Sequence, residues 1–297
     1  MAPGRLRIVQ LNAASLIEPD WEHRRGEVAA WIDHLDPDVV CLQEIWEDAS
    51  HPCSAGEVVE RLDGGSWHWV FGGGPFEGMF GADGSLRFGS AVLSRWPIDD
   101  HTYHRLPVGP GASGFLAAVP WELLHVRTAG LDVCSTHLAA APTDGVHRCL
   151  QVAAIDEIIG VARGDADAVT FGRPRAGMPA ILCGDFNAEP DSDEIRFLCG
   201  LTDLDGRTTY YQDAWRQAGE GVGFTQDWTS HPIAGSMNVA RKRIDYVFVG
   251  DAFQRAEGAG RVLRAERAFD RPMTGVQASD HVGLVVDLAW PGGPTRP

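Results

Sequence analysis

The sequence lacks the hydrophobic segments that direct proteins into or across membranes. No run of 18 apolar residues occurs anywhere, and no apolar segment precedes the first predicted strand within residues 1–10. We therefore expect neither a signal peptide nor a transmembrane segment, and predict a cytoplasmic location.

The cysteines do not form paired motifs. Six occur, none in a C-x-x-C pair, and three lie in apolar strand-like runs, where a thiol acts as a small buried hydrophobe. A disulfide framework is therefore not expected, and the cysteines are predicted to be reduced core residues. They are Cys41, Cys53, Cys134, Cys149, Cys183 and Cys199.

Positive charge is scarce and has no long run. The formal net charge is −16, from 25 Lys+Arg against 41 Asp+Glu, and the densest basic cluster is Arg241-Lys242-Arg243. Duplex-binding proteins normally need a basic face that displaces counterions from phosphates. The charge thus does not favour nucleic acid, although a local basic patch can sit on an acidic protein. It favours a small or locally held substrate and a bound divalent cation.

An apolar run that ends in polar side chains stands at the centre of the chain. Residues 180–183 read as a short buried strand, which stops at Gly184 and presents Asp185 and Asn187 before Pro190. Residues i and i+2 of a strand share a face, so the acid and the amide are predicted to aim at one spot. The alternative is a polar strand-to-loop turn without a site.

Periodicity along the chain predicts a mixed α/β fold. Helical spacing or caps predict helices at 21–35, 54–62, 147–163, 191–201 and 213–218. Strands are expected at 5–11, 38–46, 66–71, 90–98, 123–128, 130–137, 180–183, 243–250 and 282–288, with strand and loop at 101–119. Residues 72–89, 164–177 and 220–240 are predicted loops, and 262–269 are ambiguous. We predict one domain over residues 1–297, with a core at about 5–289 and a frayed tail at 290–297.

Six short motifs follow one another along the chain: Asn12, Gln43-Glu44, Ser135-Thr136-His137-Leu138, Gly184-Asp185-Phe186-Asn187, Arg243-Ile244-Asp245-Tyr246 and Ser279-Asp280-His281. In this order they resemble the endonuclease/exonuclease/phosphatase superfamily, which has a DNase I-like fold. The match spans nearly the whole chain, and six ordered motifs are far more specific than one. The resemblance implies a four-layer α/β sandwich of two packed mixed β-sheets flanked by helices.

The resemblance also implies a metal-dependent hydrolase of phosphoric esters. Few hard oxygen ligands suit Mg²⁺, which keeps much of its water and takes a substrate phosphate as a ligand; Mn²⁺ is the alternative ion. Glu44 is the best metal ligand in the sequence, and the resemblance places Asn12 and Asp280 near it.

Five further residues complete the implied catalytic set. By resemblance, Asp245 orients His281, which acts as general base or holds a phosphate oxygen. Asp185 is expected to activate or place the attacking water. Asn187 is expected to donate to the phosphate, and His137 to donate to it as charge develops.

The sequence departs from the abasic-site endonucleases at one position. Those enzymes have an acid two residues after the first-strand asparagine, and this chain has Ala14. The departure favours the neutral sphingomyelinase-like and phosphatase-like branches, and a phosphorylated small-molecule or lipid-like substrate for a phosphodiesterase or phosphatase. A nuclease of the same fold is the alternative, and a catalytically inactive scaffold is less favoured because every matched position is filled.

Three other residues are lesser candidates for the site. Arg148 and Gln151 share a helix face and are predicted to tie loops together, with phosphate contact as the lesser alternative. Trp228 is a lesser candidate for lining the pocket.

Overall fold

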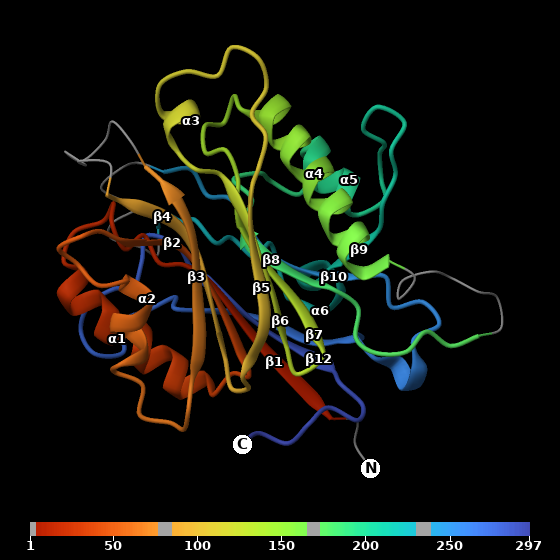
Figure 1. Cartoon of the computed structure of the whole chain (residues 1–297), viewed down its shortest axis with the longest axis horizontal. Helices are drawn as coiled ribbons and strands as arrows, with labels where there is room; N and C mark the ends of the chain where they lie inside the picture. The colour runs from red at the N-terminus through yellow and green to blue at the C-terminus, as the bar shows by residue number, and fades with distance from the viewer. Residues whose placement is uncertain (1–3, 77–84, 165–172, 230–238) are drawn as a thin grey trace.

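Two six-stranded sheets pack face to face with helices on their outer faces (Figure 1). The computed structural model describes residues 4–76, 85–164, 173–229 and 239–297. The four layers confirm the predicted α/β sandwich.

The first sheet joins strands from both ends of the sequence. Its order is β11-β12-β1-β2-β4-β3, in which β1 and β2 are parallel and all other neighbours are antiparallel. The strands are β1 (Arg5–Asn12), β2 (Val39–Glu47), β3 (His68–Pro75), β4 (Arg87–Ser94), β11 (Val262–Ala268) and β12 (Gly283–Ala289).

The second sheet holds the middle of the chain. Its order is β5-β6-β7-β8-β10-β9, and β7 and β8 form its one parallel pair. The strands are β5 (Ile98–Arg105), β6 (Glu122–Thr128), β7 (Leu131–His137), β8 (Ile181–Asp185), β9 (Tyr211–Asp213) and β10 (Asp245–Gly250).

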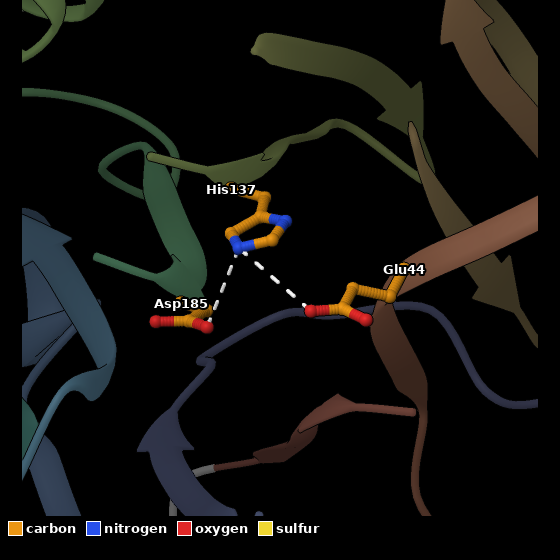
Figure 2. Close-up of side chains that lie close together, drawn as sticks. All are labelled: Glu44, His137 and Asp185. Carbon is orange, nitrogen blue, oxygen red and sulfur yellow. Dashed lines mark ion pairs between the residues drawn. The ribbon is translucent and has the colours of Figure 1, made fainter. Parts of the chain in front are cut away.

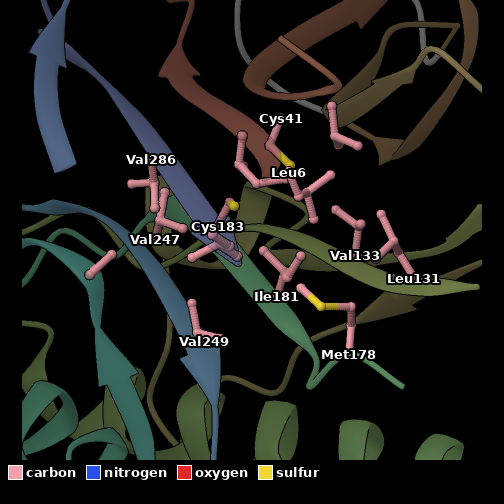
Figure 3. Close-up of a cluster of buried hydrophobic side chains, with 14 of the residues drawn as sticks. Leu6, Cys41, Leu131, Val133, Met178, Ile181, Cys183, Val247, Val249 and Val286 are labelled. Carbon is pink, nitrogen blue, oxygen red and sulfur yellow. The ribbon is translucent and has the colours of Figure 1, made fainter. Parts of the chain in front are cut away.

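Apolar side chains fill all three interfaces between the layers. Aliphatic residues and two cysteine thiols meet between the sheets, where Cys41, Cys183 and Val286 are fully buried (Figure 3). In Figure 1, α1 and α2 cover the first sheet, and α4 and α5 cover the second. The helices are α1 (Trp21–Leu35), α2 (Ser54–Val59), α3 (Phe115–Ala118), α4 (Gly145–Arg163), α5 (Asp193–Leu198) and α6 (Ala214–Ala218), with a 3₁₀ turn η2 (Ala256–Gly258).

The prediction of a loop at 72–89 was wrong at both of its ends. Residues 72–75 continue β3, and residues 87–89 begin β4; residues 77–84 of the predicted loop lie outside the described residues. The glycines that suggested a loop allow two strands to approach closely. A Cβ on Gly89 would lie 2.1 Å from the carbonyl oxygen of Gly72.

Two other segments differ from expectation. The ambiguous segment 262–269 contains the edge strand β11. Residues 290–297, predicted to be frayed, make specific contacts instead: Trp290 is buried, and Arg296 pairs with Asp36 and Asp38. The guanidinium of Arg296 therefore ties the tail to the start of β2.

The described helices give no sign of a membrane span. Within residues 4–76, 85–164, 173–229 and 239–297, none combines the length and the hydropathy that crossing a bilayer requires.

Candidate active site

The predicted site residues gather at one edge of the sandwich. The carboxyl ends of the parallel strands β1 and β2 carry Asn12 and Glu44, and those of β7 and β8 carry His137 and Asp185. Strands β10 and β12 run antiparallel to their neighbours, so their amino ends lie at the same edge. Both sheets therefore contribute side chains to one cluster.

The amide of Asn12 joins acids from the two sheets. Its Nδ2 lies 2.9 Å from Glu44 Oε1 and 3.0 Å from Asp185 Oδ2, and its Oδ1 accepts from the backbone N–H of Ala14 at 3.0 Å. All four residues are buried. A fully bonded amide of this kind holds both carboxylates in fixed positions.

Glu44 occupies an irregular point of β2. Its φ is +55°, and the register of β2 against β4 shifts between Leu42 and Ile45. This β-bulge turns the Glu44 side chain toward the neighbouring sheet, as bulges beside active sites commonly do.

His137 lies between the two carboxylates (Figure 2). Its Nε2 is 3.5 Å from Asp185 Oδ2 and 3.9 Å from Glu44 Oε1. The rings of Trp121 and Phe88 pack against the imidazole, with centroids 5.4 and 6.4 Å away. Burial lowers the pKa of His137, although the charge of Asp185 opposes this.

Asp245 and His281 meet as the predicted pair. Asp245 Oδ2 is 2.9 Å from His281 Nδ1, and the opposite nitrogen, Nε2, is 3.8 Å from Asp185 Oδ2. Burial alone would lower the pKa of His281, but the charges of Asp245, Asp280 and Asp185 raise it well above its usual value. The carboxylate of Asp245 thus fixes which nitrogen faces Asp185.

A buried chain of amides lies behind this pair. Gln10 Nε2 donates to Asp245 Oδ1 at 3.1 Å and to Gln43 Oε1 at 2.7 Å, and Gln43 Nε2 donates to Ser135 Oγ at 2.9 Å. These residues have no exposed surface. The chain links β10 to β1, β2 and β7, and so holds Asp245 in place across the two sheets.

The acidic donor set fits a divalent cation. Glu44 Oε2 is buried without a hydrogen-bond partner, and burial together with the charge of Asp280 raises the pKa of Glu44 to about 7. An orphaned carboxylate oxygen repelled by a second acid is stabilised by a hard cation. Groups with ligand atoms within 4.8 Å of one another are Glu44–His137–Asp185 and Asp185–Asp245–His281.

Two predicted residues lie at the margin of the cluster. Asp280 belongs to neither of those groups, but its charge acts on both Glu44 and His281. Asn187, at φ +49°, uses one hydrogen of Nδ2 in a bond to the carbonyl oxygen of Leu138 at 3.0 Å. Its second amide hydrogen has no role in that bond.

Sequence reasoning missed two side chains near the site. Gln226 Nε2 is 3.3 Å from His281 Nε2, and Glu18 is near enough to Asp280 and Glu44 that burial and their charges raise its pKa. Both come from segments without periodicity. Gln226 lies in the predicted loop 220–240, and Glu18 lies between the first predicted strand and the first predicted helix. The only signal in the sequence was the residue type, an amide and an acid.

The lesser candidates are also placed. Arg148 is buried, with Nε 2.5 Å from Glu194 Oε1 and Nη1 bonded to the carbonyl oxygens of Ala139 and Ala141. Gln151 accepts from the backbone N–H of Ala139, so both residues tie loops together as predicted. Trp228 is 51% exposed.

Comparison with known proteins identifies relatives over most of the chain. The model of the endonuclease/exonuclease/phosphatase family matches residues 9–281. Protein angel homolog 1 of Homo sapiens is 28% identical over 214 residues, which cover 68% of this chain and 28% of that protein. Sphingomyelin phosphodiesterase 3 of Rattus norvegicus is 26% identical over 205 residues, covering 64% and 29%. The matches span less than a third of these curated relatives.

Solved structures share the fold along nearly the whole chain. An endonuclease/exonuclease/phosphatase from Beutenbergia cavernae is 25% identical, with a TM-score of 0.64 over 98% of this chain and 73% of that one. The human Nocturnin catalytic domain with bound sulfate anion is 18% identical, with a TM-score of 0.64 over 97% and 95%. D. rerio TDP2 complexed with single strand DNA product is 18% identical, with a TM-score of 0.65 over 96% and 98%.

Proposed function

Because this chain belongs to the endonuclease/exonuclease/phosphatase family, we propose that it is a Mg²⁺-dependent phosphodiesterase or phosphatase that hydrolyses a P–O bond. The observation that carries the proposal is the orphaned Glu44 Oε2, buried at the meeting point of both sheets beside two imidazoles and Asp185. Mn²⁺ is the alternative ion.

Glu44 is the principal metal ligand in this proposal, supported by Asn12 and Asp280. The bound ion supplies a Lewis acid for the phosphoryl oxygen and stabilises the leaving oxygen. Asn12 keeps Glu44 in place through its bond to Oε1, which leaves Oε2 free as a ligand atom.

Asp185 places the attacking water and takes its proton. Its Oδ2 is already oriented by Asn12 and faces the Nε2 atoms of both histidines. The carboxylate is therefore held in the middle of the cluster, where a water can bridge it to a phosphorus atom.

The two imidazoles and Asn187 stabilise charge on the phosphate. The charges of Asp245, Asp280 and Asp185 raise the pKa of His281 well above its usual value, which favours the protonated ring, and its Nε2–H then donates to a phosphate oxygen. His137 Nε2 donates from the opposite side, and Asn187 contributes its second amide hydrogen. In this assignment Asp185, and not His281, is the general base.

The proposed substrate is a phosphorylated small molecule or a lipid-like phosphodiester. One matched relative is named as a sphingomyelin phosphodiesterase, and the net charge of −16 opposes long contact with a polyanion. The alternative, a nuclease, is supported by the solved relative complexed with a single strand DNA product.

Turnover of three substrates tests the proposal. Bis-p-nitrophenyl phosphate, sphingomyelin and plasmid DNA are each incubated with Mg²⁺, with Mn²⁺ or with a chelator. We expect metal-dependent hydrolysis of at least one of the first two. Cleavage of plasmid DNA alone would favour the nuclease, and no metal-dependent turnover of any substrate would contradict the proposal.

A matched pair of variants assigns the activity to the site. Glu44→Gln should lower kcat/KM about a hundredfold or more while the fold is kept, because it removes the charge and preserves the shape. The control is Glu60→Gln, since Glu60 is an exposed acid beyond α2. Equal activity of both variants at limiting Mg²⁺ would contradict the role of Glu44.

A further inference from the structure

A cavity of about 520 Å³ is lined by three arginines. Arg196 comes from α5, Arg216 from α6, and Arg243 from the segment just before β10. One acid, Asp191, shares the lining. In a chain of net charge −16, this is a local concentration of positive charge.

Arg243 is built into the wall of this cavity. It is 6% exposed, its Nη2 is 2.7 Å from Asp213 Oδ2, and its guanidinium carbon lies 4.6 Å from the centroid of the Tyr246 ring. Its Nη1 is buried and has no hydrogen-bond partner. The ion pair and the ring contact hold this guanidinium in one position, so the wall of the cavity carries a fixed cationic group.

The other two arginines keep their charge available. Among the described residues, neither Arg196 nor Arg216 forms an ion pair with a carboxylate, and the side chain of Arg196 donates to the carbonyl oxygen of Leu201 at 3.3 Å. Arg196 is half-buried and Arg216 is exposed. The cavity thus combines one fixed and two adaptable cationic side chains.

Three segments of the chain connect the lining of the cavity with residues of the candidate active site. Arg243 precedes Asp245 by two residues, so their Cα atoms are at most about 7 Å apart. Pro190 and Asp191 follow Asn187, and Val222 precedes Gln226, which touches His281. The Tyr246 hydroxyl, 2.8 Å from the carbonyl oxygen of Ala188 and 3.0 Å from that of Arg243, links the first two segments.

We propose that this cavity, which we call the arginine pocket, binds a second phosphate group of the substrate while the scissile phosphate occupies the adjacent cluster. The inference rests on the proposed phosphoester hydrolysis. It narrows the substrate class to esters that carry a further phosphate near the bond that is cleaved. The three arginines supply the hydrogen-bond donors for this phosphate. Trp215 closes one side of the pocket, and its Nε1 donates to the carbonyl oxygen of Gly221.

Two matched substrates test the proposal by kinetics. They are the p-nitrophenyl ester of thymidine 5′-phosphate and the same ester with an added 3′-phosphate. In the protein of native sequence, we expect the added phosphate to raise kcat/KM about tenfold, mainly by lowering KM. In Arg196→Gln/Arg216→Gln that preference should vanish, while hydrolysis of the simpler ester is unchanged. Arg61→Gln/Arg264→Gln is the control, since it removes two exposed arginines elsewhere.

A binding measurement separates the pocket from the reaction. Inorganic phosphate is titrated calorimetrically into the three proteins in the presence of a chelator. Binding should be weakened about tenfold or more only in Arg196→Gln/Arg216→Gln. The proposed function fails when no substrate is turned over with a metal ion, and this titration decides separately whether the pocket binds phosphate.

Three results would overturn the inference. One is phosphate binding that is equal in all three proteins or absent from all of them. Another is an equal loss on both esters in Arg196→Gln/Arg216→Gln. The third is phosphate binding that needs the arginines without any preference between hydrolysed esters, which would make the pocket a site for free phosphate and remove it from the substrate.

Discussion

At the scale of single residues, Glu44 gives the site its sensitivity to pH. With a pKa of about 7, about half of the metal-free molecules carry a proton on Glu44 at neutral pH. A cation requires the deprotonated carboxylate, so affinity for Mg²⁺ should fall about tenfold per pH unit below pH 7 and level off above about pH 8. Calorimetry in buffers of different ionisation heat should show about one proton released at low pH. Affinity that does not change across this range would contradict the assignment.

The Asp245–His281 pair should behave as one catalytic unit. Asp245→Asn keeps the shape but removes the charge that favours the protonated ring, and the neutral ring can then take the wrong tautomer, so kcat/KM should fall about a hundredfold or more. His281→Ala should be at least as damaging, and the double variant little worse than His281→Ala alone. The four proteins are compared on one activated phosphodiester. Additive losses would mean that Asp245 serves a metal ion or a turn instead of His281.

Gln10 should act through Asp245 and without contact to the substrate. Gln10→Leu removes the donor to Asp245 Oδ1 and leaves the side-chain oxygen Oε1 of Gln43 without its donor. We expect kcat to fall about tenfold with little change in KM, and the pH–rate profile to shift. Gln217→Leu, at an exposed position of α6, is the control. An unchanged profile with a lowered melting temperature would indicate a purely structural role.

At the scale of elements, the distance between β7 and β8 depends on a glycine. A Cβ on Gly184 would lie 2.2 Å from the Thr136 carbonyl oxygen, next to the paired residues His137 and Asp185. Gly184→Ala should destabilise the fold by about 2 kcal/mol or more and lower activity further by separating those side chains. Gly26→Ala, on α1 with open space around it, should be neutral or stabilise by up to about 1 kcal/mol. Thermal unfolding of both variants is the measurement.

The elements differ in how well local pattern predicted them. Helix α1 ends where predicted because its apolar spacing and Pro37 are both local signals. The sequence of strand β11 was ambiguous because its register shifts between Val262 and Arg264. The shift breaks the alternation of inward- and outward-facing side chains along the strand. The ends of β3 and β4 were missed because their glycines serve a partner strand that is distant in sequence. A sequence pattern predicts a helix or strand well when the residues that determine its bounds lie within or next to it.

At the scale of the whole molecule, sequence order predicted most of the cluster. Polar residues at the ends of buried strands can be read directly, and the topology brings those ends to one edge. The arginine pocket could not be read in this way, since Arg196, Arg216 and Arg243 come from three segments without a shared motif. Only the three-dimensional path of the chain places them together.

The net charge of −16 should keep duplex DNA away from the molecule as a whole. A single pocket neutralises one phosphate group and provides no track along a helix. Duplex binding should therefore be weaker than about 10⁻⁶ M at physiological salt, and its dependence on salt should be shallow. A gel-shift titration at several salt concentrations checks this. Tight binding with a steep salt slope would overturn the expectation.

The central position of β1 has a consequence for how the protein is made. Strand β1 lies between β2 and β12, and Arg5 pairs with Ala289, 284 positions later in the chain. During synthesis, at about 5–20 residues per second, β1 and β2 emerge long before β12. The edge of β1 that pairs with β12 therefore has unpaired backbone N–H and C=O groups until the end of synthesis. Chaperone binding to the nascent chain should reduce aggregation most in that interval.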